Sequence, residues 1–134
     1  MATLDEVGAF LASACSMTLA TDVFIGQYPS SPDLTIALFE YPGMKPITFF
    51  GSSAIAVEYP RVQVTVRGEV DDYETPRAIA ETAYRAMAAQ GHGTLSGTRY
   101  IALEPLQSPF LIRKDEKGRP VIGFNAQITK ELSA

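Results

Sequence analysis

Apolar residues recur at helical spacing in two stretches of this chain. The first runs from about Thr3 to Ser16, where Thr3 and Glu6 match a capping box, a pair whose side chains satisfy free backbone N–H groups at a helix start. The second begins at Thr75, a predicted N-cap followed by proline, and ends at Gly91, a residue suited to a helix C-terminus. The pattern predicts two amphipathic helices separated by about sixty residues of other structure.

Other stretches alternate between apolar and polar residues, which is typical of strands. In 62–68 Val62, Val64 and Val66 should face inward, while Gln63, Thr65 and Arg67 should face outward from a sheet covered on one side only. Because few helices separate the strands, the predicted fold class is α+β: a largely antiparallel mixed sheet with two main helices packed on one face. The other strands are expected at 34–39, 99–104, 110–112 and 121–128.

The segment 40–59 fits this scheme poorly. It contains glycines and prolines typical of loops, yet it also carries Ile47, Phe49, Phe50, Ile55 and Val57. A loop of this length is usually functional or disordered, and this one is too apolar for disorder. Two interpretations stay open: a hairpin buried in its own domain, or an arm that packs on a neighbouring subunit. In either case a hairpin would turn at Gly51-Ser52.

The size of the chain sets the next limit. With 134 residues, 46% of them hydrophobic and 19% charged, residues 1–134 suit a single globular domain with a long loop or hairpin arm at about 40–59. Cys15 is the only cysteine, the N-terminus is acidic, and no apolar run is long enough for a membrane helix. We expect folding in a reducing cytoplasm and no membrane association.

The net charge of −4 disfavours binding to nucleic-acid phosphates. Arg61, Arg67 and the other separate arginines fall in different predicted elements. The densest basic stretch, 113–119, also contains Asp115, and its simplest interpretation is a solvated hairpin turn in which Gly118 takes a left-handed conformation.

Candidate chemistry is sparse. His92 is the only histidine and has no nucleophile in a local motif beside it. The glycines that flank it close a helix rather than open one, so they do not form a phosphate-binding loop. Asp71 and Asp72 lack the further ligands of a cation site, and Cys15 suits a small core residue. We therefore predict no enzyme activity, no catalytic residues, no cofactor and no metal.

Several motifs, in this order and spacing, resemble the small minor capsid proteins of tailed bacteriophages, which are similar to the tail terminators of long-tailed phages. The resemblance runs from about Leu4 to Leu132. The motifs that carry it are Ala37-Leu38-Phe39-Glu40-Tyr41, Glu58-Tyr59-Pro60-Arg61-Val62-Gln63-Val64, Leu95-Ser96-Gly97-Thr98-Arg99-Tyr100, Pro105-Leu106-Gln107-Ser108-Pro109-Phe110, and Asp115-Glu116-Lys117-Gly118-Arg119-Pro120 through Phe124-Asn125.

The resemblance implies a structural virion protein, assembled in the host cytoplasm, that forms a homo-oligomeric ring, usually a hexamer, at the head-proximal end of the tail. The implied partners are sibling copies, the tail tube protein and a head-tail connector or head-closure protein, while DNA passes through the lumen without specific binding. Phe49 and Phe50 are the expected anchors of the subunit contact, because buried aromatic residues dominate interface energetics. The full set of expected contact residues is Ile47, Phe49, Phe50, Ile55, Glu58, Arg61 and Arg67.

Two hypotheses that assign the chain to another class of function stay open. One is a small-ligand-binding or enzymatic α/β domain with its site under the 40–59 segment, which predicts a pocket with convergent polar groups. The other is a nucleic-acid binder, which the charge disfavours. A connector or head-closure subunit is a close variant of the leading hypothesis.

Overall fold

The computed structural model describes residues 3–48, 55–95 and 97–131. Two helices and a set of strands make up this part of the chain. Their bounds are α1 Thr3–Ala14, β1 Val23–Ile25, β2 Thr35–Thr48, β3 Ile55–Arg67, α2 Glu74–Gln90, β4 Gly93–Leu95, β5 Thr98–Pro105, β6 Phe110–Lys114 and β7 Pro120–Glu131.

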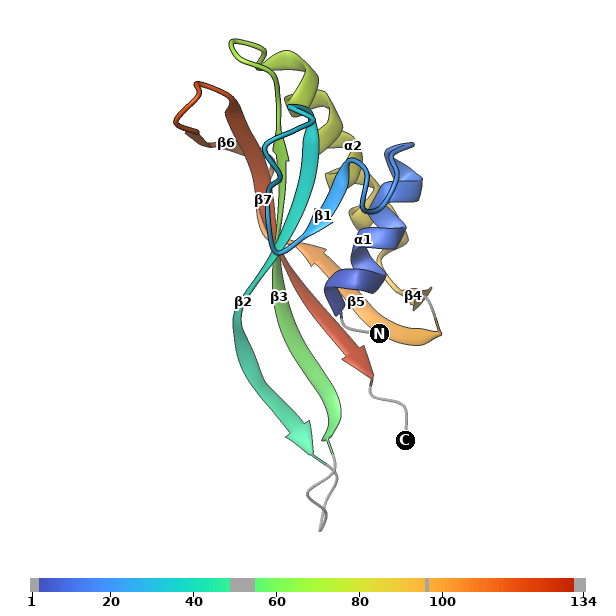
Figure 1. Ribbon diagram of the computed structural model, residues 1–134. Coiled ribbons are helices and arrows are strands. Elements are labelled where there is room, and N and C mark those ends of the chain that lie inside the picture. The colour runs from blue at the N-terminus through green and yellow to red at the C-terminus, as the bar shows by residue number, and fades with distance from the viewer. Residues whose placement is uncertain (1–2, 49–54, 96, 132–134) are drawn as a thin grey trace.

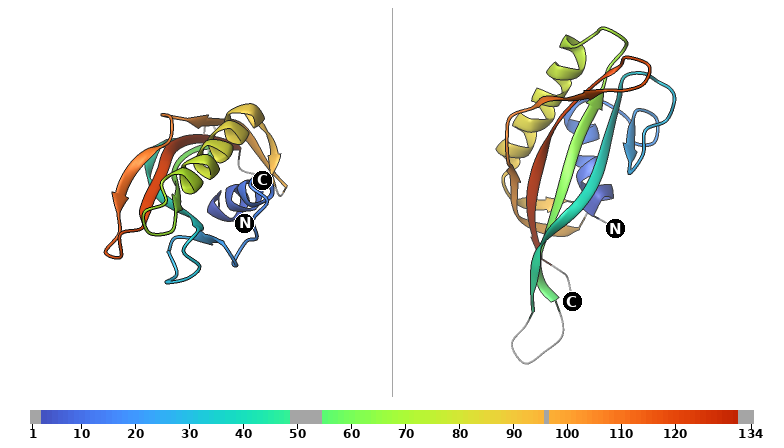
Figure 2. Two further views of the ribbon diagram at one scale, coloured as in Figure 1. Left: turned by 90° about the horizontal axis from the view of Figure 1, so that it is seen from above. Right: turned by 90° about the vertical axis from the view of Figure 1, so that its left-hand side faces the viewer.

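Within these residues seven strands form one sheet in the order β1-β2-β3-β7-β5-β4, and β6 pairs with the first part of β7. All neighbours pair antiparallel except β1 and β2, which are parallel. Both helices lie on the same side of the curled sheet (Figures 1 and 2). The predicted α+β class, with a largely antiparallel mixed sheet and two helices on one face, is confirmed.

The core lies between the helices and the sheet. Every second residue of β3 and β7 points toward the helices, and Val62, Val64, Val66, Phe124 and their neighbours on this face are buried. Removing this apolar surface from water is the main stabilising term of the fold. The helices contribute Leu4, Val7, Leu11, Ala80, Ala83 and Met87.

The first helix begins at Thr3 as predicted, but the structure corrects the predicted capping of both helices. Glu6 does not act as a capping-box partner; its buried carboxylate accepts hydrogen bonds of 2.7 Å from the hydroxyl groups of Thr98 and Tyr100. The second helix begins one residue before Thr75, whose N–H donates to the Asp72 side chain at 3.2 Å. At each helix start the polar group has a different partner from the one that the sequence spacing suggested. Glu6 bonds to two hydroxyl groups of β5, and the Thr75 N–H bonds to Asp72.

The 40–59 segment is mostly strand. β2 and β3 continue through it as an antiparallel hairpin, with Thr48 opposite Ile55 and register shifts after Tyr41, Met44 and Ile47. In Figures 1 and 2 the far half of this hairpin extends beyond the helices. The predicted turn at Gly51-Ser52 lies outside the described residues.

Candidate interaction surfaces

The face of the sheet that points away from the helices is polar. Along β3 it carries Arg61, Gln63, Thr65 and Arg67, because side chains alternate between the two faces of a strand. The prediction that this face is open was wrong at one end. Thr65 and Arg67 are buried there, because the segment that follows β1 folds back over them with Tyr28.

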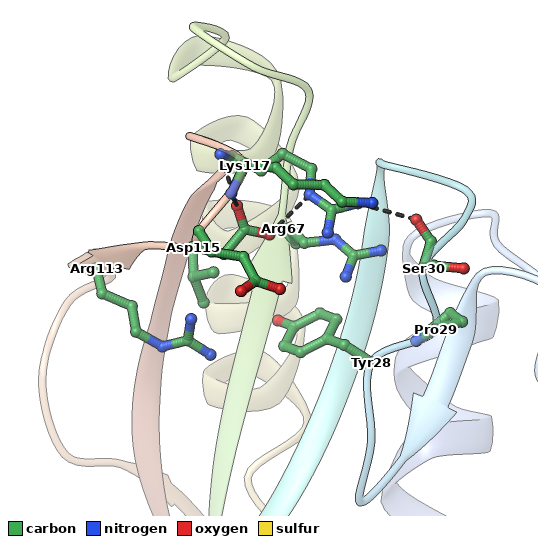
Figure 3. Close-up of a pocket in the computed structure, with 10 residues that line it drawn as sticks. Tyr28, Pro29, Ser30, Arg67, Arg113, Asp115 and Lys117 are labelled. Atoms are coloured by element: carbon green, nitrogen blue, oxygen red, sulfur yellow. Dashed lines mark hydrogen bonds and ion pairs between the residues drawn. The ribbon is translucent and has the colours of Figure 1, made fainter.

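The covered end contains a hollow of about 510 Å³. Three parts of the chain supply its walls: the 28–30 segment, Arg67 at the end of β3, and the β6–β7 turn with its flanks (Figure 3). The residues around it are Tyr28, Pro29, Ser30, Arg67, Arg113, Asp115, Glu116, Lys117, Arg119 and Val121. The predicted solvated turn is therefore partly buried, and it brings basic residues together that are far apart in the sequence.

Arg119 holds the turn in place. Its guanidinium donates to Asp115 at 2.7 Å, to Asp33 at 3.0 Å and to the carbonyl of Ser30 at 3.0 Å. Burial opposes protonation, but the hydrogen bonds to both carboxylates raise the pKa of Arg119. The turn closes at Gly118, whose φ of 82° confirms the predicted left-handed conformation. Arg119 thus ties the turn to the 30–33 segment.

Arg67 is 3% exposed and is held differently. Its guanidinium donates to the backbone carbonyls of Asp33 at 3.1 Å and Pro32 at 2.8 Å, and it lies 4.8 Å from the ring centroid of Tyr28. Burial lowers the pKa of Arg67, and the charge of Arg119 lowers it further. The Tyr28 hydroxyl is hydrogen-bonded to Thr65, and burial raises the pKa of Tyr28 to about 12, so this wall is neutral.

The predicted contact residues do not gather at one place. Ile47 and Ile55 belong to the hairpin strands, while Phe49 and Phe50 lie outside the described residues. Strand alternation puts Glu58 on the opposite face of the sheet from Arg61 and Arg67.

Partners within the chain occupy two of these residues. The Glu58 carboxylate lies 3.8 Å from the ammonium group of Lys130. Arg61 donates to Gln127 at 3.4 Å, and its Nε is buried with no acceptor in the described part of the chain.

The remaining candidate residues show little organisation. His92 is exposed directly after α2, and Cys15 packs against the core just beyond α1. Among the described residues no group of three or more His, Cys, Asp or Glu side chains could hold a metal ion. In the same residues neither helix combines the length and apolar character needed to cross a membrane.

Sequence reasoning missed two features. One is the basic hollow, whose parts come together only through pairing between distant strands. The other is a set of exposed apolar residues on β5, β6 and their connection: Ile101, Leu106, Phe110 and Leu111, each more than 40% exposed. The adjacent pair Phe110-Leu111 was a usable signal, because two consecutive strand residues cannot both point into one core.

Comparison with known proteins decides the family. A family model described as bacteriophage tail terminator protein matches residues 10–132. The chain belongs to the bacteriophage tail terminator family. This confirms the resemblance seen in the sequence motifs, and it makes the chain a structural protein of a phage tail.

A solved structure described as the virion of a native gene transfer agent particle contains a chain similar to this member of the family. The two share 17% sequence identity and superpose with a TM-score of 0.58 over 98% of this chain and 96% of the other. At this identity the likeness concerns the fold. The description of the tail terminator family names a structural role and no enzyme activity. No curated protein matches the chain.

Proposed function

We propose that this chain assembles with copies of itself into a ring at the head-proximal end of the tail, where it ends growth of the tail tube and joins the tail to the head. Six copies are the number we expect from the family resemblance. The tail tube protein and a connector or head-closure protein are then its partners, and DNA passes through the lumen without specific binding.

The open edge of β2 is the observation that supports a ring most directly. The short strand β1 pairs only with residues 36–38 of β2, so the outer edge of the remaining strand has no partner in the described residues. An unpaired strand edge offers backbone N–H and C=O groups to another chain. A closed ring needs such a patch to meet a different patch on the next copy.

The extended hairpin supplies the contact in this proposal. Its described strand ends, Thr48 and Ile55, pair with each other in the part of the hairpin that reaches beyond the helices (Figure 1). We assign the subunit contact to Ile47, Phe49, Phe50, Ile55, Glu58 and Arg61. Arg67 is no longer part of this set, because its side chain is buried within the same chain.

Native mass spectrometry and electron microscopy of the purified protein, alone and with tail tubes, test the proposal. We expect a closed ring, at least in the presence of tubes. The double variant Phe49→Ser/Phe50→Ser should lose assembly while its circular dichroism spectrum still shows the folded chain. Phe110→Ser removes an exposed phenyl group from β6 and should leave the ring intact. A protein that stays monomeric and ignores tubes would contradict the proposal.

A further inference from the structure

The basic hollow differs in charge from the molecule around it. Four of its ten lining residues are basic (Arg67, Arg113, Lys117 and Arg119) and two are acidic (Asp115 and Glu116), which gives a local charge of +4 − 2 = +2. The whole chain carries −4. A concave site of one sign within a surface of the other attracts ligands of opposite charge.

The charges of Asp115 and Asp33 compensate Arg67 only partly, and they do so without direct contact. Within the described residues no carboxylate forms an ion pair with it, and its two hydrogen bonds go to neutral carbonyl groups. A buried cation without a directly paired anion is costly, and an incoming anion would lower that cost. The ring of Tyr28 and the two carbonyl groups already fix the plane of the guanidinium, so little side-chain entropy is lost when a ligand binds.

Arg113 faces Arg67 across the hollow. Figure 3 shows its guanidinium directed toward Tyr28, from the strand on the other side. Arg113 and Lys117 are both exposed, and neither forms an ion pair with another described residue. Arg119, in contrast, is saturated by Asp115 and Asp33. The hollow therefore has one buried and two exposed cations available to a ligand.

We propose that this hollow is a carboxylate-binding site that receives an acidic segment of another protein chain. Guanidinium groups match the two oxygens of a carboxylate in one plane. Asp115 and Glu116 at the same site favour a singly charged group over the denser charge of a phosphate. A duplex would need a longer row of cations than three. The apolar surfaces of Tyr28, Pro29 and Val121 suit the stem of an acidic side chain.

Titration followed by NMR tests the proposal on the isolated protein. The probe is a blocked peptide with the sequence Glu-Val-Asp-Asp-Tyr-Glu, which is the exposed acidic stretch 69–74 of this chain, compared with Gln-Val-Asn-Asn-Tyr-Gln. We expect saturable shifts of the Nε–H signals of Arg67 and Arg113 with the acidic peptide and none with its amide counterpart. Inorganic phosphate and a short DNA duplex are titrated in parallel.

Two variants assign the site. Arg113→Gln/Lys117→Gln should weaken the acidic peptide by at least about fivefold, because it removes two charged donors. Lys114→Gln is the control: it removes one positive charge from the strand that carries Arg113, but Lys114 lines a different hollow with Asp71 and Tyr73. It should change binding less than about twofold, as expected for an exposed charge outside the site.

Three results would overturn the proposal. They are no saturable shift up to about 10 mM peptide, which corresponds to negligible affinity; equal binding of the amide peptide; and tighter binding of DNA or phosphate that Arg113→Gln/Lys117→Gln abolishes. The titration needs no assembly, so it can succeed or fail independently of the proposed ring.

Discussion

The two faces of the sheet differ in how their side chains are satisfied. Toward the helices, Val62, Val64 and Val66 are fully buried against other apolar groups. On the opposite face of the same strand, Arg61 has a buried Nε without an acceptor in the described residues, and Arg67 is buried with neutral partners only. The face toward the helices stabilises the fold. The opposite face retains polar groups to which another molecule could supply a hydrogen-bond acceptor or a counter-charge.

The largest expected effect comes from the helix-facing side. Phe124→Ala removes a fully buried ring that also makes an edge contact with Tyr84 at 5.6 Å between centroids. Urea unfolding should show a loss of about 3–4 kcal/mol. Asn125→Ala, the next residue on the other face, should cost less than about 0.5 kcal/mol. If the two variants lost equal unfolding free energy, both faces of the sheet would contribute equally to stability.

A smaller, pH-dependent effect is expected at the hollow. Burial opposes ionisation of Asp115, but hydrogen bonds from the backbone N–H of Arg119, from its guanidinium and from the N–H of Lys117 lower the pKa of Asp115 below its ordinary value of 3.8. A lowered pKa stabilises the fold above the unfolded-state value, and this stabilisation is lost as the pH falls through the folded-state value.

Asp115→Asn should therefore lower the free energy of unfolding by about 1–2 kcal/mol near neutral pH, as expected for a charge-assisted hydrogen bond. The difference from the natural protein should shrink below the ordinary pKa of 3.8. Urea unfolding at about pH 7 and about pH 2.5 measures both values. A difference that stays constant would show that the carboxylate charge plays no part.

The smallest effect should come from Arg61→Met. The arginine has one long hydrogen bond, of 3.4 Å to Gln127, and a buried Nε without an acceptor in the described residues. A thioether side chain fills similar space without an unsatisfied donor, so the free energy of unfolding should change by less than about 0.5 kcal/mol. A large loss in urea unfolding would show that Arg61 is better satisfied than the structure indicates.

Much of the fold follows from local pattern. The valines of 62–66 and the helical spacing of 75–91 indicate burial directly. An element with one covered face repeats its apolar residues with the period of that strand or helix. The pattern failed where a second layer covers only part of a strand. Alternation placed Arg67 outside, and nothing near it in the sequence shows that Tyr28 folds over it.

The hollow could not be predicted for the same reason. Arg67 is 46 residues from Arg113 and 52 from Arg119, and only the pairing of β7 with both β3 and β6 brings them together. The 113–119 turn resembled any charged turn, since Asp115 and Glu116 offset its basic residues. The contact residues of the hairpin remain a prediction.

The bonds between Glu6 and the hydroxyl groups of Thr98 and Tyr100 have a consequence for the order of folding. They join positions 92 and 94 residues apart, so α1 is fastened by a strand that the ribosome makes much later than this helix. Closing so long a loop carries a large entropy cost, which nearer contacts must offset beforehand. The Glu6 carboxylate therefore meets these partners only after β5 has been made, while the contacts of α1 with β1 and β2 join nearer parts of the chain.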